Sequence, residues 1–332
     1  MYDNPCPPGI ILADTTILES LMQKVGVIGL GWMGKVHLRN YSEMHGVEIM
    51  GVVDTDQATL DEVAARFGVP TFTNLDDLLA KGLDAVSVCV PTSLHHQVGL
   101  KVIASGASLL IEKPLAATAA EGAELVAAAK AKGVALMVGH IERFNPAVQR
   151  VKELVGDDVI SIQIERVGPY PPRIQDVGVI RDLGSHDIDL IRFLTGSEYR
   201  HVYAVCTTSQ GKHEDNALIT AQMENGVLAN VNTNWVTPYK SRKIRVAAKS
   251  KFIVADLVTQ EVREFSQFST YDKSYSVREW PMIYREPVKE ELTQFLKAVR
   301  DKTPVPITGE DGLEVLKVIE RIFACGEETC RP

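Results

Sequence analysis

Cysteine is scarce in this chain and follows no pattern. The 332 residues contain five cysteines, at positions 6, 89, 206, 325 and 330, and no two have the spacing of a zinc-binding motif. Other potential metal ligands lack such a spacing as well: His95, His96, His140, Asp182 and His186. We therefore expect reduced thiols, as in a cytoplasmic protein, and no metal centre.

An excess of positive charge and long apolar runs are absent too. Lys and Arg number 35 against 43 Asp and Glu, a net charge of −8 at pH 7. This balance excludes a basic surface for nucleic acid or anionic membranes. No run reaches the roughly 18 to 20 apolar residues of a membrane span. Residues 1–22 lack the basic start of a signal peptide, so we interpret them as an appendage.

The dominant motif is a glycine-rich turn after a short apolar run. Residues 25–30 predict a buried strand, and Gly29-x-Gly31-x-x-Gly34 leads into a helical pattern. In such a turn the first glycine permits the bend. The second lets the backbone approach a pyrophosphate, and the third lets helix and strand pack closely. The free N–H groups and the dipole at the helix start favour an anionic diphosphate.

An acidic residue stands where a dinucleotide-binding fold needs one. A second predicted strand, residues 47–53, ends at Asp54. Asp54 follows the last glycine by about 20 residues, where a carboxylate receives the ribose hydroxyls of NAD and repels the 2′-phosphate of NADP. Two alternatives stay open: Asp54 caps the following helix, or Lys35 and Arg39 admit NADP.

The order of elements predicts an α/β fold with two domains. Strands and helices alternate to residue 139, which indicates a Rossmann-type, doubly wound parallel sheet in residues 23–145. Six short strand patterns between residues 159 and 256, with a hairpin signal at 224–226, predict an open, mainly antiparallel sheet in an α+β domain, residues 146–332. Residues 264–285 are polar and unpatterned, and we expect a long loop there.

Polar residues follow the predicted parallel strands at their carboxyl ends, where ligands of such sheets bind. Thr92 and His95 follow the fourth strand, and Glu112-Lys113-Pro114 follows the fifth. Pro114 restricts Lys113 to an extended backbone, which aims its side chain. A solvated surface lysine is the alternative.

A second constellation lies in the other predicted domain. In a helix, Asp182, His186 and Asp189 would fall at i, i+4 and i+7, on one face. A carboxylate beside an imidazole fixes its tautomer and raises its basicity. A solvated surface pair is an equally open interpretation.

Together these motifs resemble the glucose–fructose oxidoreductase/inositol dehydrogenase (Gfo/Idh/MocA) family, over about residues 23–325. Residues 138–146, 166–173 and 176–179 are similar to its UDP-N-acetylglucosamine 3-dehydrogenase branch. Trp32 departs from the small residue usual in the phosphate turn. The resemblance implies oxidation of the sugar C3 hydroxyl to a 3-keto sugar with NAD. It also implies dimers or tetramers formed through the open sheet.

The resemblance also implies roles for single residues. Lys113, Asp182 and His186 are the expected catalytic set. His186 would be the base, Lys113 would polarise the hydroxyl and Asp182 would orient the set. An unperturbed His has a pKa of about 6.5 and an unperturbed Lys one of about 10.4, which favours His186 as the base at neutral pH. Lys113 remains an alternative base. The cofactor contacts expected are Gly29, Gly31, Trp32, Met33, Gly34, Asp54, Pro91, Thr92, His95, Glu112 and Lys113.

A sugar diphosphate needs local cations on so acidic a chain, and arginine suits bidentate phosphate contacts. The expected substrate contacts are Arg143, Arg166, Tyr170, Arg173, Asp182 and His186, with Arg181 close by. Two other functions stay open. One is a free polyol or inositol dehydrogenase with the same catalytic set, and the other is a catalytically silent NAD(H)-binding sensor.

Overall fold

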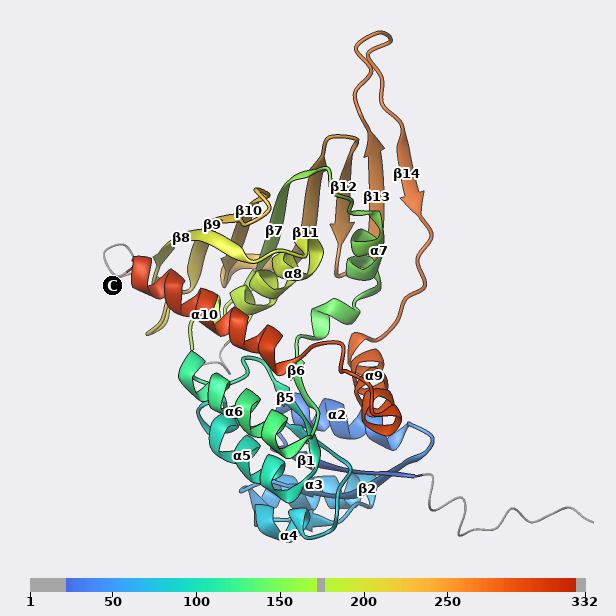
Figure 1. Cartoon of the computed structure of the whole chain (residues 1–332), viewed down its shortest axis with the longest axis vertical. Coiled ribbons are helices and arrows are strands. Elements are labelled where there is room, and N and C mark those ends of the chain that lie inside the picture. Colours follow the sequence, from blue (N-terminus) through green and yellow to red (C-terminus); the bar gives the residue numbers. More distant parts are fainter. Residues whose placement is uncertain (1–21, 172–176, 327–332) are drawn as a thin grey trace, which may run out of the picture.

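The computed structural model describes residues 22–171 and 177–326. It consists of two sheets with their helices, one sheet in each half of the chain (Figure 1). Arg173 and residues 1–21 lie outside the described residues. Within the described residues, no helix combines the length and apolarity needed to cross a membrane.

The first sheet has the predicted parallel, doubly wound topology. Its six strands lie in the order β3 (Thr71–Phe72), β2 (Val47–Val53), β1 (Gln23–Ile28), β4 (Ala85–Val88), β5 (Ser108–Glu112) and β6 (Leu136–Gly139). Val25 and Val27 of the central strand are fully buried. The apolar runs read from the sequence therefore form a sheet covered on both faces.

Helices connect these strands, and local signals set their ends. They are α2 (Trp32–Ser42), α3 (Gln57–Phe67), α4 (Leu75–Leu79), α5 (His95–Ser105) and α6 (Ala119–Lys132). Asp56 and Thr118 cap the starts of α3 and α6 by accepting a hydrogen bond from a backbone N–H three residues on. Gly68 and Gly133 end the same helices in the left-handed conformation.

The second sheet has eight strands and is mainly antiparallel, as predicted. Its order is β14 (Val277–Trp280), β13 (Glu261–Ser266), β12 (Lys251–Asp256), β11 (Val236–Ala248), β7 (Val159–Pro169), β10 (Leu228–Asn234), β9 (Asn216–Met223) and β8 (Tyr199–Thr207). Only β7 and β10 pair in parallel. Helices α7 (Pro146–Leu154), α8 (Ser185–Thr195) and α10 (Gly309–Gly326) pack against one face (Figure 1).

The predicted long loop at residues 264–285 is wrong. This stretch contains the end of β13 and all of β14, which form a hairpin that projects from the edge of the second sheet (Figure 1). Most of its side chains are exposed on both faces, so no alternation of apolar and polar residues marks the strands.

Helix α9 (Pro287–Asp301) joins the first half of the molecule, although its sequence follows the second sheet. Leu292 and Phe295 are fully buried in the core around the parallel sheet, and α9 packs beside α2. The division of the chain at residue 145 remains a prediction.

One expectation about the cysteines needs correction. Cys206, on β8, is disulfide-bonded, whereas Cys89 and Cys325 are free thiols. Sequence spacing carried no signal for this bond, because a disulfide depends on which side chains the fold brings together.

Candidate active site

A cavity of about 540 Å³ lies where the parallel sheet meets the second half of the chain. All residues expected around the cofactor line it, except Gly34. Val177, Arg181 and Asp182 close it from the other side. The carboxyl ends of β1, β2, β4 and β5 therefore open into one crevice, as a doubly wound sheet requires.

The glycines of the turn have the separate functions that their spacing predicts. Gly29 has a φ of 86°, and a Cβ on it would lie 2.7 Å from the carbonyl oxygen of Cys89. A Cβ on Gly34 would lie 1.8 Å from the carbonyl oxygen of Gly29. Gly31 precedes α2 and faces open space, with nothing within 4 Å of a built Cβ. This open cradle at a helix start fits a diphosphate.

Asp54 is held against the glycine-rich turn. Its Oδ2 accepts a hydrogen bond of 2.6 Å from Leu30 N, and its Oδ1 accepts one of 3.0 Å from Asp56 N. The cap of α3 is Asp56, not Asp54. The carboxylate of Asp54 therefore lies in the cavity wall beside the turn, where a ribose would bind.

The two cations near this position are engaged elsewhere. Lys35 Nζ lies 2.7 Å from an oxygen of Glu62, and Arg39 forms an ion pair with Glu286. Neither is directed at Asp54 in these contacts, so the surroundings favour NAD over NADP.

Lys113 and Asp182 meet across the cavity from the two halves of the chain. Lys113 follows β5, and its Nζ donates to Asp182 Oδ1 at 2.7 Å and to the Asp182 carbonyl oxygen at 2.9 Å. About one sixth of each side chain is exposed, at 15% and 17%. An ammonium is thus fixed at the cavity wall by a carboxylate of the second domain.

The helix around Asp182 differs from the predicted one. Residues Ile180–Gly184 form a π-helical turn before α8 begins. The regular α-helix that the spacing assumed over Asp182 and His186 is therefore interrupted. Within the described residues no hydrogen bond joins this pair. The expected set on one face is therefore divided, since Asp182 bonds Lys113 and Asp189 bonds Arg143.

His186 lies among positively charged side chains that act on its pKa. Burial is the main reason that its pKa is lowered well below the usual value, and the charges of Lys113, Arg166 and Arg242 lower it further. Its Nδ1 is buried and has no hydrogen-bond partner among the residues that the structure describes. The imidazole is therefore neutral near pH 7 and able to accept a proton.

Two family descriptions match this chain. "Oxidoreductase family, NAD-binding Rossmann fold" covers residues 23–140, and "GFO/IDH/MocA C-terminal domain" covers residues 149–253. The chain belongs to the Gfo/Idh/MocA oxidoreductase family. NAD is the cofactor of its Rossmann domain, and the named relatives are dehydrogenases of sugar and polyol hydroxyls.

The relatives of this family member include enzymes of both substrate classes. A UDP-N-acetylglucosamine 3-dehydrogenase of Acidithiobacillus ferrooxidans is 31% identical over 88% of this chain and 94% of its own length. A solved structure of that enzyme superposes with a TM-score of 0.87, at 29% identity, over 93% of this chain and 99% of the other. A myo-inositol 2-dehydrogenase of Thermotoga maritima is 26% identical over 87% of this chain and 92% of its own.

A solved relative carries the cofactor. GenD2 from gentamicin A biosynthesis, in complex with NAD, superposes with a TM-score of 0.81 at 25% identity and covers 98% of each chain. The Gfo/Idh/MocA assignment and the cradle formed by Gly31 and Asp54 therefore both indicate a dinucleotide cofactor.

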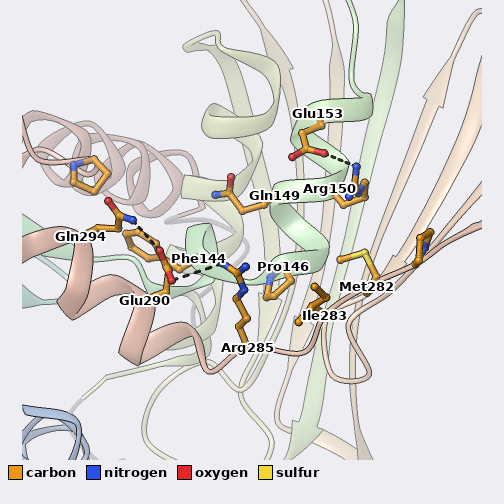
Figure 2. A pocket seen from close by; sticks show the side chains of 12 residues that line it. Phe144, Pro146, Gln149, Arg150, Glu153, Met282, Ile283, Arg285, Glu290 and Gln294 are labelled. Carbon is orange, nitrogen blue, oxygen red and sulfur yellow. Dashed lines mark hydrogen bonds and ion pairs between the residues drawn. The ribbon is translucent and has the colours of Figure 1, made fainter. Parts of the chain in front are cut away.

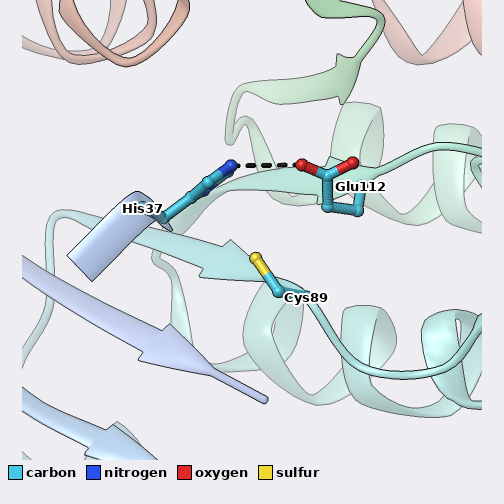
Figure 3. Close-up of side chains that lie close together, drawn as sticks. All are labelled: His37, Cys89 and Glu112. Carbon is cyan, nitrogen blue, oxygen red and sulfur yellow. Dashed lines mark ion pairs between the residues drawn. The ribbon is translucent and has the colours of Figure 1, made fainter. Parts of the chain in front are cut away.

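Behind the cavity, buried polar side chains support Glu112 (Figure 3). His37 Nε2, from α2, lies 3.1 Å from Glu112 Oε1, while His37 Nδ1 lies 3.0 Å from Ser87 Oγ. Cys89 completes a group whose ligand atoms lie within 4.8 Å of one another. Burial raises the pKa of the Cys89 thiol well above its usual value, so the thiol is not in the form that binds a metal. We interpret the group as support for Glu112.

His95 is a positioning residue rather than a free ligand. Its Nδ1 lies 2.8 Å from the carbonyl oxygen of Pro114 and its Nε2 lies 2.9 Å from that of Val90. Burial lowers the pKa of this imidazole. The ring thereby ties the loop after β4 to the turn that carries Lys113.

The predicted substrate arginines are occupied by carboxylates. Arg143 makes a bidentate pair with Asp189, through Nε at 2.8 Å and Nη2 at 2.6 Å, and also contacts Asp311. Arg166 is 1% exposed and donates to Asp187 and to Glu142, each at 2.7 Å. These buried ion pairs join residues 142 and 143 to α8 and β7, and they leave few donors for a substrate.

Three further residues named from the sequence have different surroundings. Arg181 lines the cavity while donating to the carbonyl oxygen of Ala117 at 3.0 Å. Tyr170 packs edge-on against Trp235, with ring centroids 5.7 Å apart. His140 is buried, and neither ring nitrogen has a hydrogen-bond partner in the part of the chain that the structure describes.

A second cavity, of about 470 Å³, lies beside α7 and α9, away from these motifs (Figure 2). Polar side chains in its wall contact one another: Arg150 lies 2.6 Å from Glu153, and Gln294 donates a hydrogen bond of 2.8 Å to Glu290. It contains none of the expected catalytic or cofactor residues.

Sequence reasoning missed Arg242, which lies 2.9 Å from Glu142 on the covered side of the second sheet. A signal was present. Arg242 alternates with the apolar Ile244 and Val246, which places it on the buried face of the strand. The predicted strand began one residue too late to include it.

Proposed function

We propose that this family member oxidises the C3 hydroxyl of UDP-N-acetylglucosamine to a 3-keto sugar with NAD. The observation that carries the proposal is the contact between Lys113 and Asp182 in the wall of the cofactor cavity, with the neutral imidazole of His186 within range of the same ammonium. The choice of sugar is supported by the relative at 31% identity.

Different residues of the chain have different roles in the proposed reaction. A bound NAD supplies the acceptor for the hydride that leaves the sugar carbon. His186 accepts the hydroxyl proton at a ring nitrogen, because its environment keeps it unprotonated. Lys113 donates a hydrogen bond to the same oxygen and stabilises the negative charge that develops there. Asp182 holds Lys113 in place, and not His186 as the helical spacing suggested.

The open face of the second sheet supports a proposal about assembly. Side chains that alternate with buried ones on β8, β9, β10 and β12 leave large apolar groups in solvent: Tyr203, Val205, Leu218, Leu228 and Phe252. A dimer or tetramer that covers this face would remove them from water. Measurement of the mass in solution tests this, and a monomer at all working concentrations contradicts it.

NAD reduction against a panel of substrates tests the proposed reaction. The panel contains UDP-N-acetylglucosamine, UDP-glucose, free N-acetylglucosamine and myo-inositol. We expect turnover with UDP-N-acetylglucosamine and identify the product as the 3-keto sugar by mass and NMR. Turnover with myo-inositol alone would establish the polyol alternative. Tight NADH binding without turnover of any member would establish the silent sensor.

A further inference from the structure

Two arginines face each other on the covered side of the second sheet. Arg166 of β7 and Arg242 of β11 are direct partners in the antiparallel register. Both donate from Nη1 to the same atom, Oε1 of Glu142, at 2.7 and 2.9 Å. Like charges directly opposite each other destabilise a strand pair. One carboxylate oxygen shared by two guanidiniums compensates only part of that repulsion.

Donors remain available in this cluster. The side chain of Arg242 is 30% exposed, and its Nε and Nη2 have no hydrogen-bond partner in residues 22–171 and 177–326. Lys240, two residues earlier, is exposed and makes no ion pair with the described residues. The Nη2 of buried Arg166 likewise lacks a hydrogen-bond partner within the described part of the chain. In contrast, Arg143 directs Nε and Nη2 at carboxylates.

Lys240 lies in an irregular stretch of β11. The register of β11 against β7 shifts between Val236 and Ser241, so the four residues 237–240 lie opposite the single residue Gly168. Such bulges redirect side chains and are frequent beside active sites. Arg242 follows directly on the regular part of the strand, so the two cations lie at the same border of the sheet.

The positively charged side chains of this cluster outnumber its carboxylates. Lys240, Arg242 and Arg166 face Glu142 and Asp187, and burial raises the pKa of Asp187 to about 6. The neighbouring Arg242 is the main reason that the pKa of Lys240 is lowered. Burial, and then the charge of Arg166, lowers the pKa of Arg242. The cluster therefore has an excess of positive charge although the chain carries −8.

This cluster borders the catalytic set. Arg242 is close enough to His186 to lower its pKa, and Asp182 is among the charges that act on Arg242. Hydrogen bonds link Arg242 to the same segment, because it shares Glu142 with Arg166, and Arg166 donates to Asp187, the residue after His186.

We propose that Lys240 and Arg242 form an anion-binding site that receives the diphosphate of a nucleotide sugar. The inference rests on the proposed function, and it assigns the phosphate contacts to β11 in place of the expected Arg143 and Arg166. The free edge of the Arg242 guanidinium binds one phosphate in a fork, and the Lys240 ammonium binds as a point charge. An uncharged polyol gains nothing from either residue, so the pair selects for nucleotide sugars.

Calorimetric titration with UDP and with uridine, on enzyme saturated with NAD, tests the site. The variants are Lys240→Gln and Arg242→Gln, and Lys249→Gln at the far end of β11 is the matched control. We expect each of the two variants to weaken UDP binding by about 10-fold or more, as loss of a charge-assisted hydrogen bond does. Uridine and NAD binding should stay the same, and kcat/KM for UDP-N-acetylglucosamine should fall as UDP affinity does.

The outcomes separate this inference from the proposed function. UDP affinities in both variants equal to that of the unmodified enzyme would overturn the anion site while leaving the reaction intact. Failure of the unmodified enzyme to bind UDP or turn over its sugar would overturn both. Lys240 is exposed and forms no ion pair with any described residue, so Lys240→Gln tests the site even if Arg242→Gln unfolds.

Discussion

The Lys113 ammonium lies 2.7 Å from Asp182 Oδ1, a contact between residues 69 positions apart in the sequence. It joins the carboxyl end of β5 to the π-helical turn before α8. Such a contact fixes the side chain that we propose reaches the reacting hydroxyl, and it links the two halves of the chain.

We expect Lys113→Met to lower kcat by about 100-fold or more, because the oxygen that loses its proton is no longer stabilised. Asp182→Asn should lower kcat less, since Lys113 keeps its bond to the Asp182 carbonyl oxygen. The Kd of NAD, from fluorescence titration, should change little in either variant. Undiminished turnover in Lys113→Met would remove this residue from the mechanism.

The acid side of the pH–rate profile should identify the base. Burial and nearby cations lower the pKa of His186, so its neutral form persists as the pH falls through about 6.5. We therefore expect kcat to remain constant across that range and to fall only at lower pH. A decline that begins above neutrality would indicate Lys113 as the base. His186→Ala should lower kcat by about 100-fold or more, and His96→Ala is a control on the surface.

Asp54 should determine the choice of cofactor. In Asp54→Ser we expect the Kd of NAD to rise by about 10-fold, because a charge-assisted hydrogen bond to the ribose is lost. NADP should gain relative to NAD, since the repelling carboxylate is gone. Asp56→Ser, which keeps a cap on α3, serves as the control. Unchanged NAD affinity in Asp54→Ser would show that the carboxylate only supports the turn through Leu30.

Arg143 should contribute to stability more than to substrate binding. Its side chain is 9% exposed and its partner Asp189 is 1% exposed. Removing one member of a buried pair costs about 3–5 kcal/mol of unfolding free energy, against about 1 kcal/mol or less at the surface. Arg143→Met should therefore unfold at much lower urea concentration than Arg150→Met. A raised KM with unaltered stability would restore Arg143 to the substrate site.

Glu291 should make stability depend on pH. It is fully buried on α9, neither oxygen has a hydrogen-bond partner within the described residues, and burial raises its pKa well above the usual value. The folded chain therefore binds this proton more tightly than the unfolded chain does. The protein should lose up to about 1.4 kcal/mol per pH unit above the unfolded value of about 4.3. Glu291→Gln should remove that slope, so its Tm should exceed that of the unmodified protein increasingly as the pH rises. Parallel Tm curves would contradict this.

Local patterns in the sequence were enough to gather the glycine turn and Asp54 around one cavity. The strand, the glycine turn and Asp54 lie within about 30 residues, and each interaction among them is set by spacing along one βαβ unit. The order of elements was enough for both sheets, because alternation distinguishes parallel from hairpin-linked strands. The hairpin of β13 and β14 was not predicted, because apolar and polar residues do not alternate in a strand that is exposed on both faces.

The substrate half depended on contacts between distant segments. The sequence by itself determined that an ammonium, an imidazole and several arginines were present, and where along the chain they lay. Only the tertiary structure decided which arginines have free donors, since carboxylates on other elements occupy Arg143 and Arg166 but leave part of Arg242 open. It likewise decided that Asp182 bonds Lys113, because the fold brings the end of β5 against the π-helical turn that carries Asp182, 69 positions further along the chain.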